Sequence, residues 1–310
     1  MIAPIRISVI MPLYNKAPYV AEAIESVLRQ THPAFEIIVI DDGSTDGGPD
    51  LVKQISDTRI KLVSQANAGV SVARNHGIDI ASGDFVAFLD ADDRYQPGFL
   101  AKIAELIEQF PEAGMLCTAY SCFWDDGNKE ERRLRGAPPG QSLCIPDFYA
   151  AWAQGAFTFT STIAIAIAIG LLKTSTLRFP PGEKLGEDQD LWFRTAESTS
   201  VAYANSPLAD YRMGVQGSAT QGNAVLDILP CYRRLSERLE RKQVPERMRH
   251  GARRLLASHI LNIVRANLSA GSLQKAANFL VDRRTFGNPL YLVRTLLLFA
   301  FSALKTNTKP

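Results

Sequence analysis

The chain has 310 residues, of which 46% are hydrophobic and 21% are charged, and its formal net charge is +2. This is ordinary globular composition, and the length allows one substantial α/β core with an appended part. The cysteines (Cys117, Cys122, Cys144 and Cys231) form no Cys-x-x-Cys pair and have no His at ligand spacing, which argues against a zinc or disulfide framework and for mostly buried thiols in a reduced cytosolic setting.

The first 119 residues alternate between predicted strands and predicted helices. Residues 6–11 and 36–40 are β-branched apolar runs, which are typical of strands buried on both faces. Between them, apolar residues recur at helical spacing over 19–28, and Pro18 suits the first turn of that helix. The same patterns predict helices over 51–55, 69–80 and 99–110, and strands over 60–63, 85–89 and 115–119. This alternation predicts a mostly parallel sheet with right-handed crossovers.

The rest of the chain is less regular. Residues 122–146 are polar and rich in Gly, Pro and Arg, which predicts a long surface loop, and residues 157–169 alternate like a half-buried strand. The last section is predicted to be helical, because one helix face would collect Leu255, Leu256, His259, Ile260, Ile263 and Val264. We therefore expect an α/β domain over residues 1–222 and a basic helical region over 223–310.

Two of the predicted strands end in carboxylates. Residues 41–46 (DDGSTD) follow the strand at 36–40, and residues 90–93 (DADD) follow the strand at 85–89. In an open parallel sheet, ligands bind just outside the carboxyl ends of the strands. Three carboxylates within four residues repel one another unless a cation compensates them, and Mg2+ or Mn2+, bound through one or two carboxylates and phosphate oxygens, would do so. The alternative is a pair of solvated acidic turns.

A third acidic group lies at residues 186–194 (GEDQDLWFR). Asp188, Leu191 and Trp192 fall on one helical face, so this segment is predicted to open a helix. Acidic residues there complement the helix dipole. That effect accounts for Glu187 or Asp190, but it gives no special reason for all three carboxylates.

In their order and spacing, five segments closely resemble the family 2 glycosyltransferases. They are residues 8–15 (SVIMPLYN), 41–46, 67–75 (NAGVSVARN), 90–93 and 186–188 (GED). The resemblance covers about residues 5–220, weakens over 123–155 and does not extend to the C-terminal section. It implies the GT-A fold, an α/β sandwich that binds a nucleotide-sugar.

The resemblance also implies roles for individual residues. The positions that hold the nucleotide are Pro12, Tyr14, Asp41, Asp42, Arg74 and Asp90. Asp92 matches the metal ligand of the family's Asp-x-Asp motif, for Mn2+ or Mg2+, and Asp188 matches the catalytic base. Tyr211 and Arg212, followed by Ser218, match a late pattern to which we attach no role.

Two departures from the family pattern bear on the function. The Gln-x-x-Arg-Trp signature of processive polymerases is missing after Asp188, which argues against a membrane-embedded polysaccharide synthase. Where family members often carry a basic residue after the strand at 163–169, this chain has Gly170, Leu171 and Leu172 before Lys173.

These parts imply an inverting hexosyl- or N-acetylhexosaminyl-transferase. It would move the sugar of a UDP-sugar to a hydroxyl of a saccharide or lipid-linked acceptor, in surface polysaccharide or glycoconjugate biosynthesis. One base and one metal suit a single displacement without a covalent intermediate. A haloacid-dehalogenase-like phosphatase fits less well because residues 41–43 have the wrong spacing, and a dehydrogenase would need G-x-G-x-x-G after the first strand. The alternative is a non-catalytic sugar-nucleotide-binding protein on the same fold.

Charge is unevenly distributed along the chain. Residues 225–310 contain 16 Lys/Arg and 5 Asp/Glu, whereas residues 1–224 contain 18 and 27. The acidic body argues against a nucleic-acid partner. The apolar run at 289–304 is interrupted by Arg294 and is too short to span a bilayer.

The basic tail and its apolar run predict that residues 283–309 contact an anionic membrane surface without crossing it. An equally good alternative is that this run packs on the catalytic domain or on a second subunit. The N-terminus has no signal-peptide pattern. We therefore expect a cytoplasmic protein, peripheral on the inner face of the cytoplasmic membrane.

Overall fold

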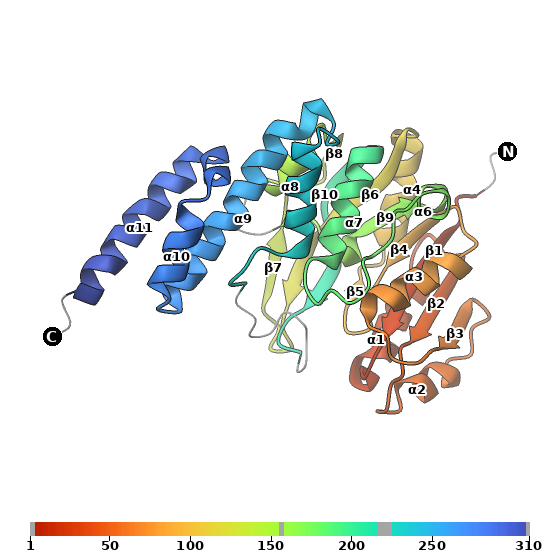
Figure 1. Ribbon diagram of the computed structural model, residues 1–310. Coiled ribbons are helices and arrows are strands. Elements are labelled where there is room, and N and C mark those ends of the chain that lie inside the picture. The colour runs from red at the N-terminus through yellow and green to blue at the C-terminus, as the bar shows by residue number, and fades with distance from the viewer. Residues whose placement is uncertain (1–3, 155–157, 216–224, 308–310) are drawn as a thin grey trace. The chain divides into compact units, whose positions relative to one another are not determined.

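The computed structural model describes residues 4–154, 158–215 and 225–307, and its chain divides into two compact units (Figure 1). The first unit contains Met1–Ile145 and Gly155–Ser218, and the second contains Pro146–Gln154 and Ala219–Pro310. The second unit therefore includes a short segment from the middle of the chain. The sequence-based boundary between residues 222 and 223 lies outside the described residues.

One sheet forms the centre of the first unit, with strands in the order β3-β2-β1-β4-β9-β6-β10-β5. Parallel pairs join β1 to β2 and β4, β2 to β3, and β6 to β10, whereas β9 runs antiparallel to β4 and β6. The expectation of an α/β fold with a mostly parallel central sheet is confirmed. The strands on this path are β1 (Ile7–Leu13), β2 (Glu36–Asp41), β3 (Ile60–Ser64), β4 (Phe85–Phe88), β5 (Arg94–Tyr95), β6 (Ala113–Phe123), β9 (Ile165–Ala168) and β10 (Ser200–Arg212).

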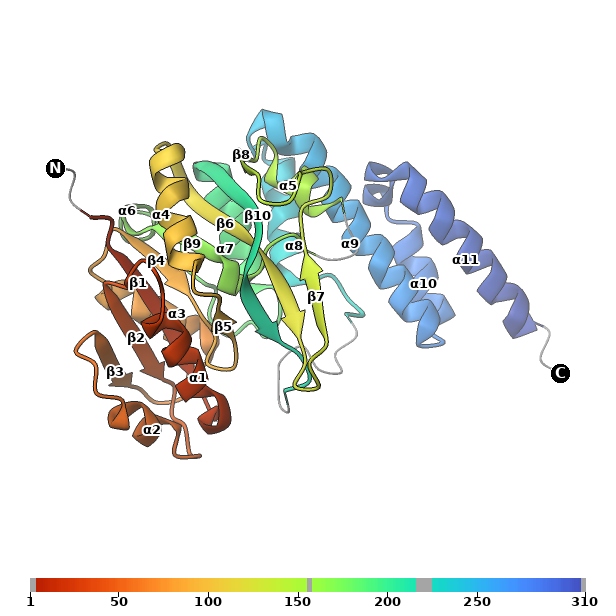
Figure 2. The same cartoon turned by 180° about the vertical axis from the view of Figure 1, so that it is seen from behind.

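Helices cover both faces of this sheet, as Figures 1 and 2 show from opposite sides. On one face lie α1 (Ala17–Leu28) and α4 (Phe99–Gln109), and on the other lie α3 (Val70–Ile80) and α7 (Glu187–Ser198). Two shorter helices complete the unit: α2 (Gly48–Gln54) and α6 (Ile169–Thr174). The helices and strands predicted within the first 119 residues are all present, and β6 extends further, to Phe123.

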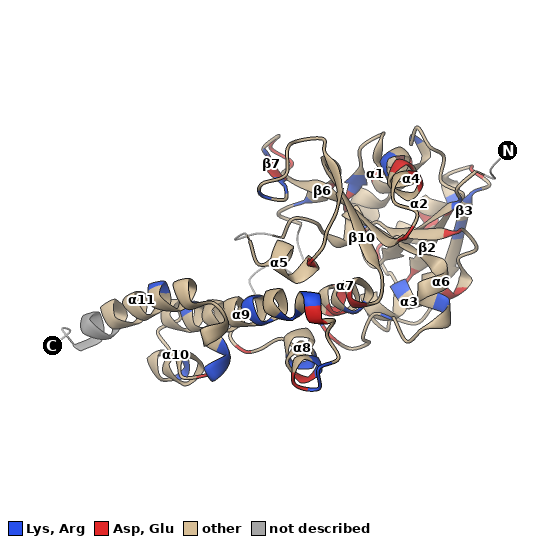
Figure 3. Ribbon diagram, turned by 90° about the horizontal axis from the view of Figure 1, so that it is seen from above, with Lys and Arg blue, Asp and Glu red and all other residues tan. Residues whose placement is uncertain are grey.

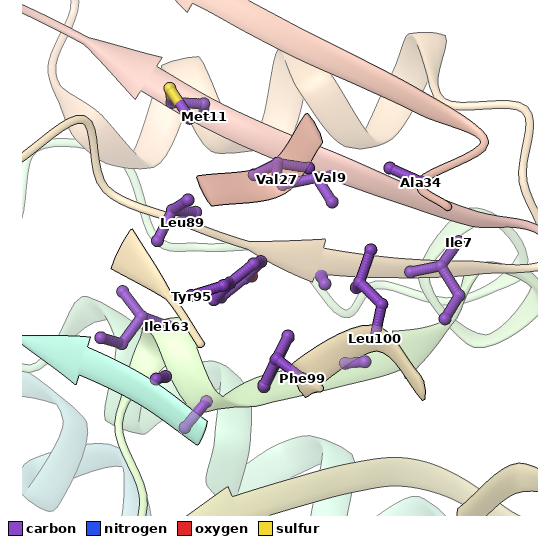
Figure 4. Packing of buried hydrophobic residues seen from close by; sticks show 14 of the residues in the cluster. Ile7, Val9, Met11, Val27, Ala34, Leu89, Tyr95, Phe99, Leu100 and Ile163 are labelled. Carbon is purple, nitrogen blue, oxygen red and sulfur yellow. The ribbon is translucent and has the colours of Figure 1, made fainter. Parts of the chain in front are cut away.

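The side chains of β1 alternate between the two faces of the sheet, and this explains why helices cover both faces. Val9 and Met11 point into the core beneath α1 and α4, where Leu89 and Tyr95 join them (Figure 4). Ile10 points to the other face, against α3. A Cβ at Gly77 would lie 2.4 Å from Cγ2 of Ile10, so this glycine allows α3 to approach the sheet closely.

The prediction of a loop over residues 122–146 is wrong. The segment contains β7 (Lys129–Arg132), which pairs with β6, and β8 (Ser142–Cys144), which pairs with β10. The residues of β7 are all charged, and its arginine pairs with Glu130. An outer strand tolerates such residues because its side chains reach solvent, so the polar composition reflected exposure rather than the absence of a strand.

The strand predicted over residues 157–169 is much shorter, since only β9 is extended, and a 3-10 turn, η1 (Thr162–Ala164), precedes it. Phe159, Ile163 and Ala166 are all buried, so the alternation in this segment does not mark one exposed face. Phe157 lies outside the described residues. The long strand β10 was not predicted at all. Bulges interrupt its pairing with β6, and they disturb the period that would have signalled a strand.

The second unit is helical, as predicted. Its helices are α5 (Phe148–Trp152), α8 (Pro230–Glu240), α9 (Arg249–Ser269), α10 (Leu273–Leu280) and α11 (Pro289–Asn307), with 3-10 turns η2 (Glu246–Met248) and η3 (Arg283–Gly287). The predicted apolar face of α9 is buried, and His259 on it stacks on Tyr232 with ring centroids 3.8 Å apart. Lys and Arg recur along α8 to α11 (Figure 3). Within the described residues, none of the helices is long and apolar enough to cross a membrane.

The cysteine side chains are mostly buried, as expected. All four lie within the described residues, and none of them takes part in a disulfide. Cys117, Cys122 and Cys231 are buried.

Candidate active site at the carboxyl ends of the strands

The ends of β1 and β2 bring the first two motifs side by side. Pro12 lies opposite Ile40 in the parallel register, and the Oδ1 of Asn15 accepts a hydrogen bond from the backbone N–H of Thr45 (2.8 Å). Asn15 adopts a positive φ of 51°, which turns the chain out of β1. The ring of Tyr14 is 49% exposed beside this turn, and it can therefore stack on a planar ligand such as a base.

Asp41 and Asp42 are buried and hold the loops around them. Asp41 accepts a hydrogen bond from the N–H of Ser44 (2.9 Å). Asp42 accepts from the N–H groups of Ala68 (2.9 Å) and Gly69 (2.8 Å), which lead into α3. Both carboxylates thus shape the backbone at the strand ends, a role that the sequence did not reveal.

Arg74 links the second acidic motif to the third. It projects from α3, is 4% exposed, and pairs with Asp90 (2.8 Å) and Glu187 (3.1 Å), while its guanidinium lies over the ring of Phe179. Although burial opposes its charge, the carboxylates of Asp90 and Glu187 raise the pKa of Arg74 above its ordinary value. A permanent positive charge therefore lies between the end of β4 and the start of α7.

Asp92 and Asp93 are neighbours with different environments. The Nζ of Lys16 donates a hydrogen bond to Asp92 at 2.6 Å, and the Asp92 side chain keeps 16% of its surface exposed. Asp93 is buried and accepts a hydrogen bond from the backbone N–H of Arg212 (2.7 Å). Burial, together with the charges of Asp92 and Asp90, raises the pKa of Asp93 well above its ordinary value. Asp92 is thus the more accessible of the two.

Arg212 belongs to the late sequence pattern to which we attached no role. Its side chain contacts and stabilises the Asp92–Asp93 turn. Its Nε donates to the backbone carbonyl of Asp92 (2.9 Å), and its other nitrogens bond to Glu22 and Asp125. The guanidinium also lies over the ring of Phe123, 4.5 Å from the centroid. This residue holds the turn at the end of β4 in place. Ser218, which completed that pattern, lies outside the described residues.

Asp188 lies in the first turn of α7, as predicted. Its Oδ2 accepts a hydrogen bond from the hydroxyl of Thr162 (2.8 Å), and its Oδ1 accepts one from the N–H of Gln189 (2.6 Å). The adjacent Glu187 faces Arg74. Burial, followed by the charge of Asp188, raises the pKa of Glu187 to about 6, against the lowering effect of Arg74. This pair of carboxylates therefore shares a strongly charged environment.

The carboxylates suit a metal ion that takes some of its ligands from the protein and the others from a substrate. Among the described residues, no group of three or more His, Cys, Asp or Glu side chains could form a cage for an ion. Asp90 and Asp92 provide partly exposed carboxylate oxygens, which are hard donors. The ammonium of Lys16 already pairs with Asp92, so this carboxylate binds a cation. Such a site fits Mg2+ or Mn2+ held by one or two carboxylates, with diphosphate oxygens and water as the other ligands.

The structure connects some of the predicted residues directly and others only through the backbone. Asp90, Arg74 and the Glu187–Asp188 pair form one contact chain, and Lys16 joins the turn of β1 to Asp92. The side chain of Asp41 bonds within its own loop, and that of Asp42 bonds to the loop before α3. The sequence did not single out Lys16, Thr162 or Glu187 as site residues. Lys16 directly follows the segment 8–15, which was a signal, whereas Thr162 had none because only the fold brings it to Asp188.

The fold and this site define a class of protein: a GT-A α/β sandwich with a carboxylate-lined site at the ends of its strands. The structure resembles that of residues 1–349 of Staphylococcus aureus TarS in complex with UDP-GlcNAc, with a TM-score of 0.67 and 19% identity over 96% of this chain and 81% of that one. A family model described as glycosyl transferase family 2 matches residues 8–165. The chain belongs to glycosyl transferase family 2.

Curated relatives support this membership. TuaG of Bacillus subtilis, a glycosyltransferase provisionally assigned to teichuronic acid biosynthesis, is 33% identical over 67% of this chain and 79% of its own length. GlyA of Streptococcus pneumoniae, named a glycosyltransferase, is 37% identical over 69% of this chain and 31% of its own length. The uncharacterized glycosyltransferase YibD of Escherichia coli is 40% identical over 39% of this chain. This match spans about a third of YibD, 36% of its length.

Proposed function

We propose that this protein is an inverting glycosyltransferase that moves a hexosyl or N-acetylhexosaminyl group from a UDP-sugar to a hydroxyl of a saccharide or lipid-linked acceptor. One observation carries the proposal: Arg74 joins the carboxylate turn at Asp90 to the start of α7, where Asp188 lies. A donor diphosphate beside Asp92 would thus lie close to a carboxylate able to accept a proton. The TarS complex with UDP-GlcNAc and the assignment of TuaG support a role in surface polysaccharide or glycoconjugate biosynthesis.

In this proposal, the nucleotide lies against the ends of β1, β2 and β4. Tyr14 and Pro12 contact the base, and Asp90 lies near the ribose. Asp41, Asp42 and Arg74 line the same surface, which their hydrogen bonds and ion pairs shape. In the proposal, they also contact the nucleotide.

Asp188 is the proposed base. A sugar hydroxyl is a weak nucleophile near neutral pH, and a positioned carboxylate that takes its proton during attack accelerates the reaction by about 10²–10⁴-fold. The attack comes from the face opposite the diphosphate, so the configuration at the anomeric carbon inverts. The transition state has oxocarbenium-ion character, which the surrounding carboxylates stabilise.

Asp92, with Asp90 beside it, is the proposed holder of Mn2+ or Mg2+. When bound, the ion supplies Lewis-acid stabilisation of the leaving diphosphate. For Asp92 to take this role, the ammonium of Lys16 has to leave its carboxylate, to which it is bonded at 2.6 Å. The ammonium of Lys16 is then free to pair with a phosphate of the donor.

The donor is testable directly. In the presence of Mn2+, we expect slow hydrolysis of one UDP-sugar, with release of UDP, when a panel of nucleotide-sugars is screened; UDP-GlcNAc is the first candidate. A matched panel of donors in which other nucleotides replace UDP serves as the control for nucleobase specificity. If the protein binds UDP tightly but turns over none of the donors, even with saccharide and lipid-linked acceptors added, the non-catalytic alternative holds.

We also propose that the protein acts in the cytoplasm, on the inner face of the cytoplasmic membrane. On α11, Leu292 and Thr295 are buried, whereas a row of apolar side chains one turn apart is exposed: Leu290, Val293 and Leu297, at 78%, 55% and 68%. Arg283 and Arg294 are exposed near this row, and Asp282, the sole acidic residue between 273 and 302, is bonded to Arg284. Each basic residue near an anionic lipid surface contributes about 1 kcal/mol.

Vesicle flotation tests this membrane contact. We expect the full chain to float with vesicles of phosphatidylcholine and phosphatidylglycerol at low salt and to be released partly at high salt. The triple variant Leu290→Ser, Val293→Ser, Leu297→Ser should stay in solution, while the control Leu51→Ser, at an exposed apolar position of α2, should float. If the full chain stays in solution and sediments as a dimer that the triple variant loses, the row is a protein interface instead.

A further inference from the structure

The carboxylate of Asp188 is held by one donor on each oxygen. The Oγ1 of Thr162 donates to Oδ2 at 2.8 Å, and the N–H of Gln189 donates to Oδ1 at 2.6 Å. An ionised carboxylate has about four acceptor positions, so two remain open to a substrate hydroxyl. The two donors fix the plane of the carboxylate and hence the direction in which those positions point.

Thr162 is itself held rigidly. It is 5% exposed and begins the 3-10 turn η1, in which the N–H of Ala164 donates to the carbonyl of Ser161 (2.8 Å). The next two residues, Ile163 and Ala164, are fully buried, and η1 contacts β4, β6 and β10. Threonine also has a restricted χ1 angle. The Thr162 hydroxyl therefore belongs to a buried turn that packs on the sheet, rather than to a surface loop.

We propose that Thr162 is the positioning residue for the proposed catalytic carboxylate: its hydroxyl orients Asp188 toward the acceptor. This inference rests on the proposed role of Asp188 as the base. It needs no further group, because the hydroxyl donates its own proton to the hydrogen bond and keeps it throughout the reaction.

The test compares Thr162→Val with Thr162→Ser in the kcat and KM of transfer. Valine has nearly the same shape but no donor, so we expect kcat to fall about 10–100-fold, with the KM for the donor within a few-fold. Serine keeps the donor and should restore most of the rate.

Thr160→Val is the matched control. Thr160 is equally buried two residues earlier, and its hydroxyl lies at Cys117 instead of Asp188. This variant should keep the wild-type kcat and KM. Thermal melting and UDP calorimetry show whether each variant is folded, and if Thr162→Val is not, Thr162→Ala takes its place in the same comparison.

The outcomes separate this inference from the proposed function. If Asp188→Asn is inactive but Thr162→Val has the wild-type kcat, the role of Thr162 is overturned and that of Asp188 stands. If Thr162→Val and Thr162→Ser lose the same rate, Thr162 serves packing alone. If Asp188→Asn keeps its activity, the assignment of the base fails, and with it the inference about Thr162.

Discussion

Replacing Asp188 by Asn should reduce sugar transfer by about 10²–10⁴-fold while leaving the affinity for UDP within a few-fold. Asparagine keeps the shape of the side chain and can still accept the hydrogen bond from Thr162, but it cannot take a proton from the acceptor. The loss corresponds to about 3–5 kcal/mol of transition-state stabilisation. Initial rates with a saturating donor, together with calorimetry of UDP binding, measure the two effects separately.

Asp190→Asn is the control on the same helix. Asp190 is buried two residues further along and pairs with Arg194 at 2.8 Å, so its loss should lower the melting temperature but not remove the chemistry. An Asp188→Asn enzyme that keeps most of its transfer rate would show that the base lies elsewhere. Glu187 is then the first candidate, because its raised pKa of about 6 allows it to exchange a proton near neutral pH.

Removal of divalent metal should weaken UDP binding by at least about tenfold, and Mn2+ or Mg2+ should restore it. A diphosphate beside Asp90 and Asp92 meets like charge on both, and Lys16 alone is poorly placed to neutralise both the diphosphate and Asp92. Calorimetry of UDP binding with a chelator, and then with excess metal, measures the difference.

Two variants test whether the effect of metal on UDP binding arises at Asp92. Asp92→Asn should remove most of the response to metal, because it removes the proposed ligand. Asp84→Asn alters a surface carboxylate that pairs with Arg6 away from the site, and it should respond to metal as the wild type does. Equal UDP affinity with and without the chelator would mean that Lys16 and Arg74 supply the positive charge and that the site is independent of metal.

The sequence by itself determined the order of the first elements and the place of the site. Long runs such as those of β1, β2 and β4 are buried on both faces, so their composition alone marks them as central strands. The carboxyl ends of parallel strands meet at one edge, which predicts that Asp41, Asp42 and Asp90 lie along the same edge of the sheet. The roles of these residues, and of Asp92 and Asp188, remain predictions that the experiments above decide.

The sequence failed where neighbours rather than composition decide the structure. The charged strand β7 exists because β6 offers it an edge, and β10 is extended despite bulges because it lies between β6 and β5. Strand propensity depends mainly on such partners, which lie far away in the sequence.

The connections within the site were likewise decided by tertiary structure. Arg74 and Glu187 are separated by 113 positions, and Thr162 and Asp188 by 26, so no local pattern records their contacts. A motif shows which chemical groups reach a strand end or a helix start. Whether a carboxylate there is paired, buried or held by a hydroxyl depends on the elements packed against it. Their burial of the carboxylate and their charges set the stability of its charged form.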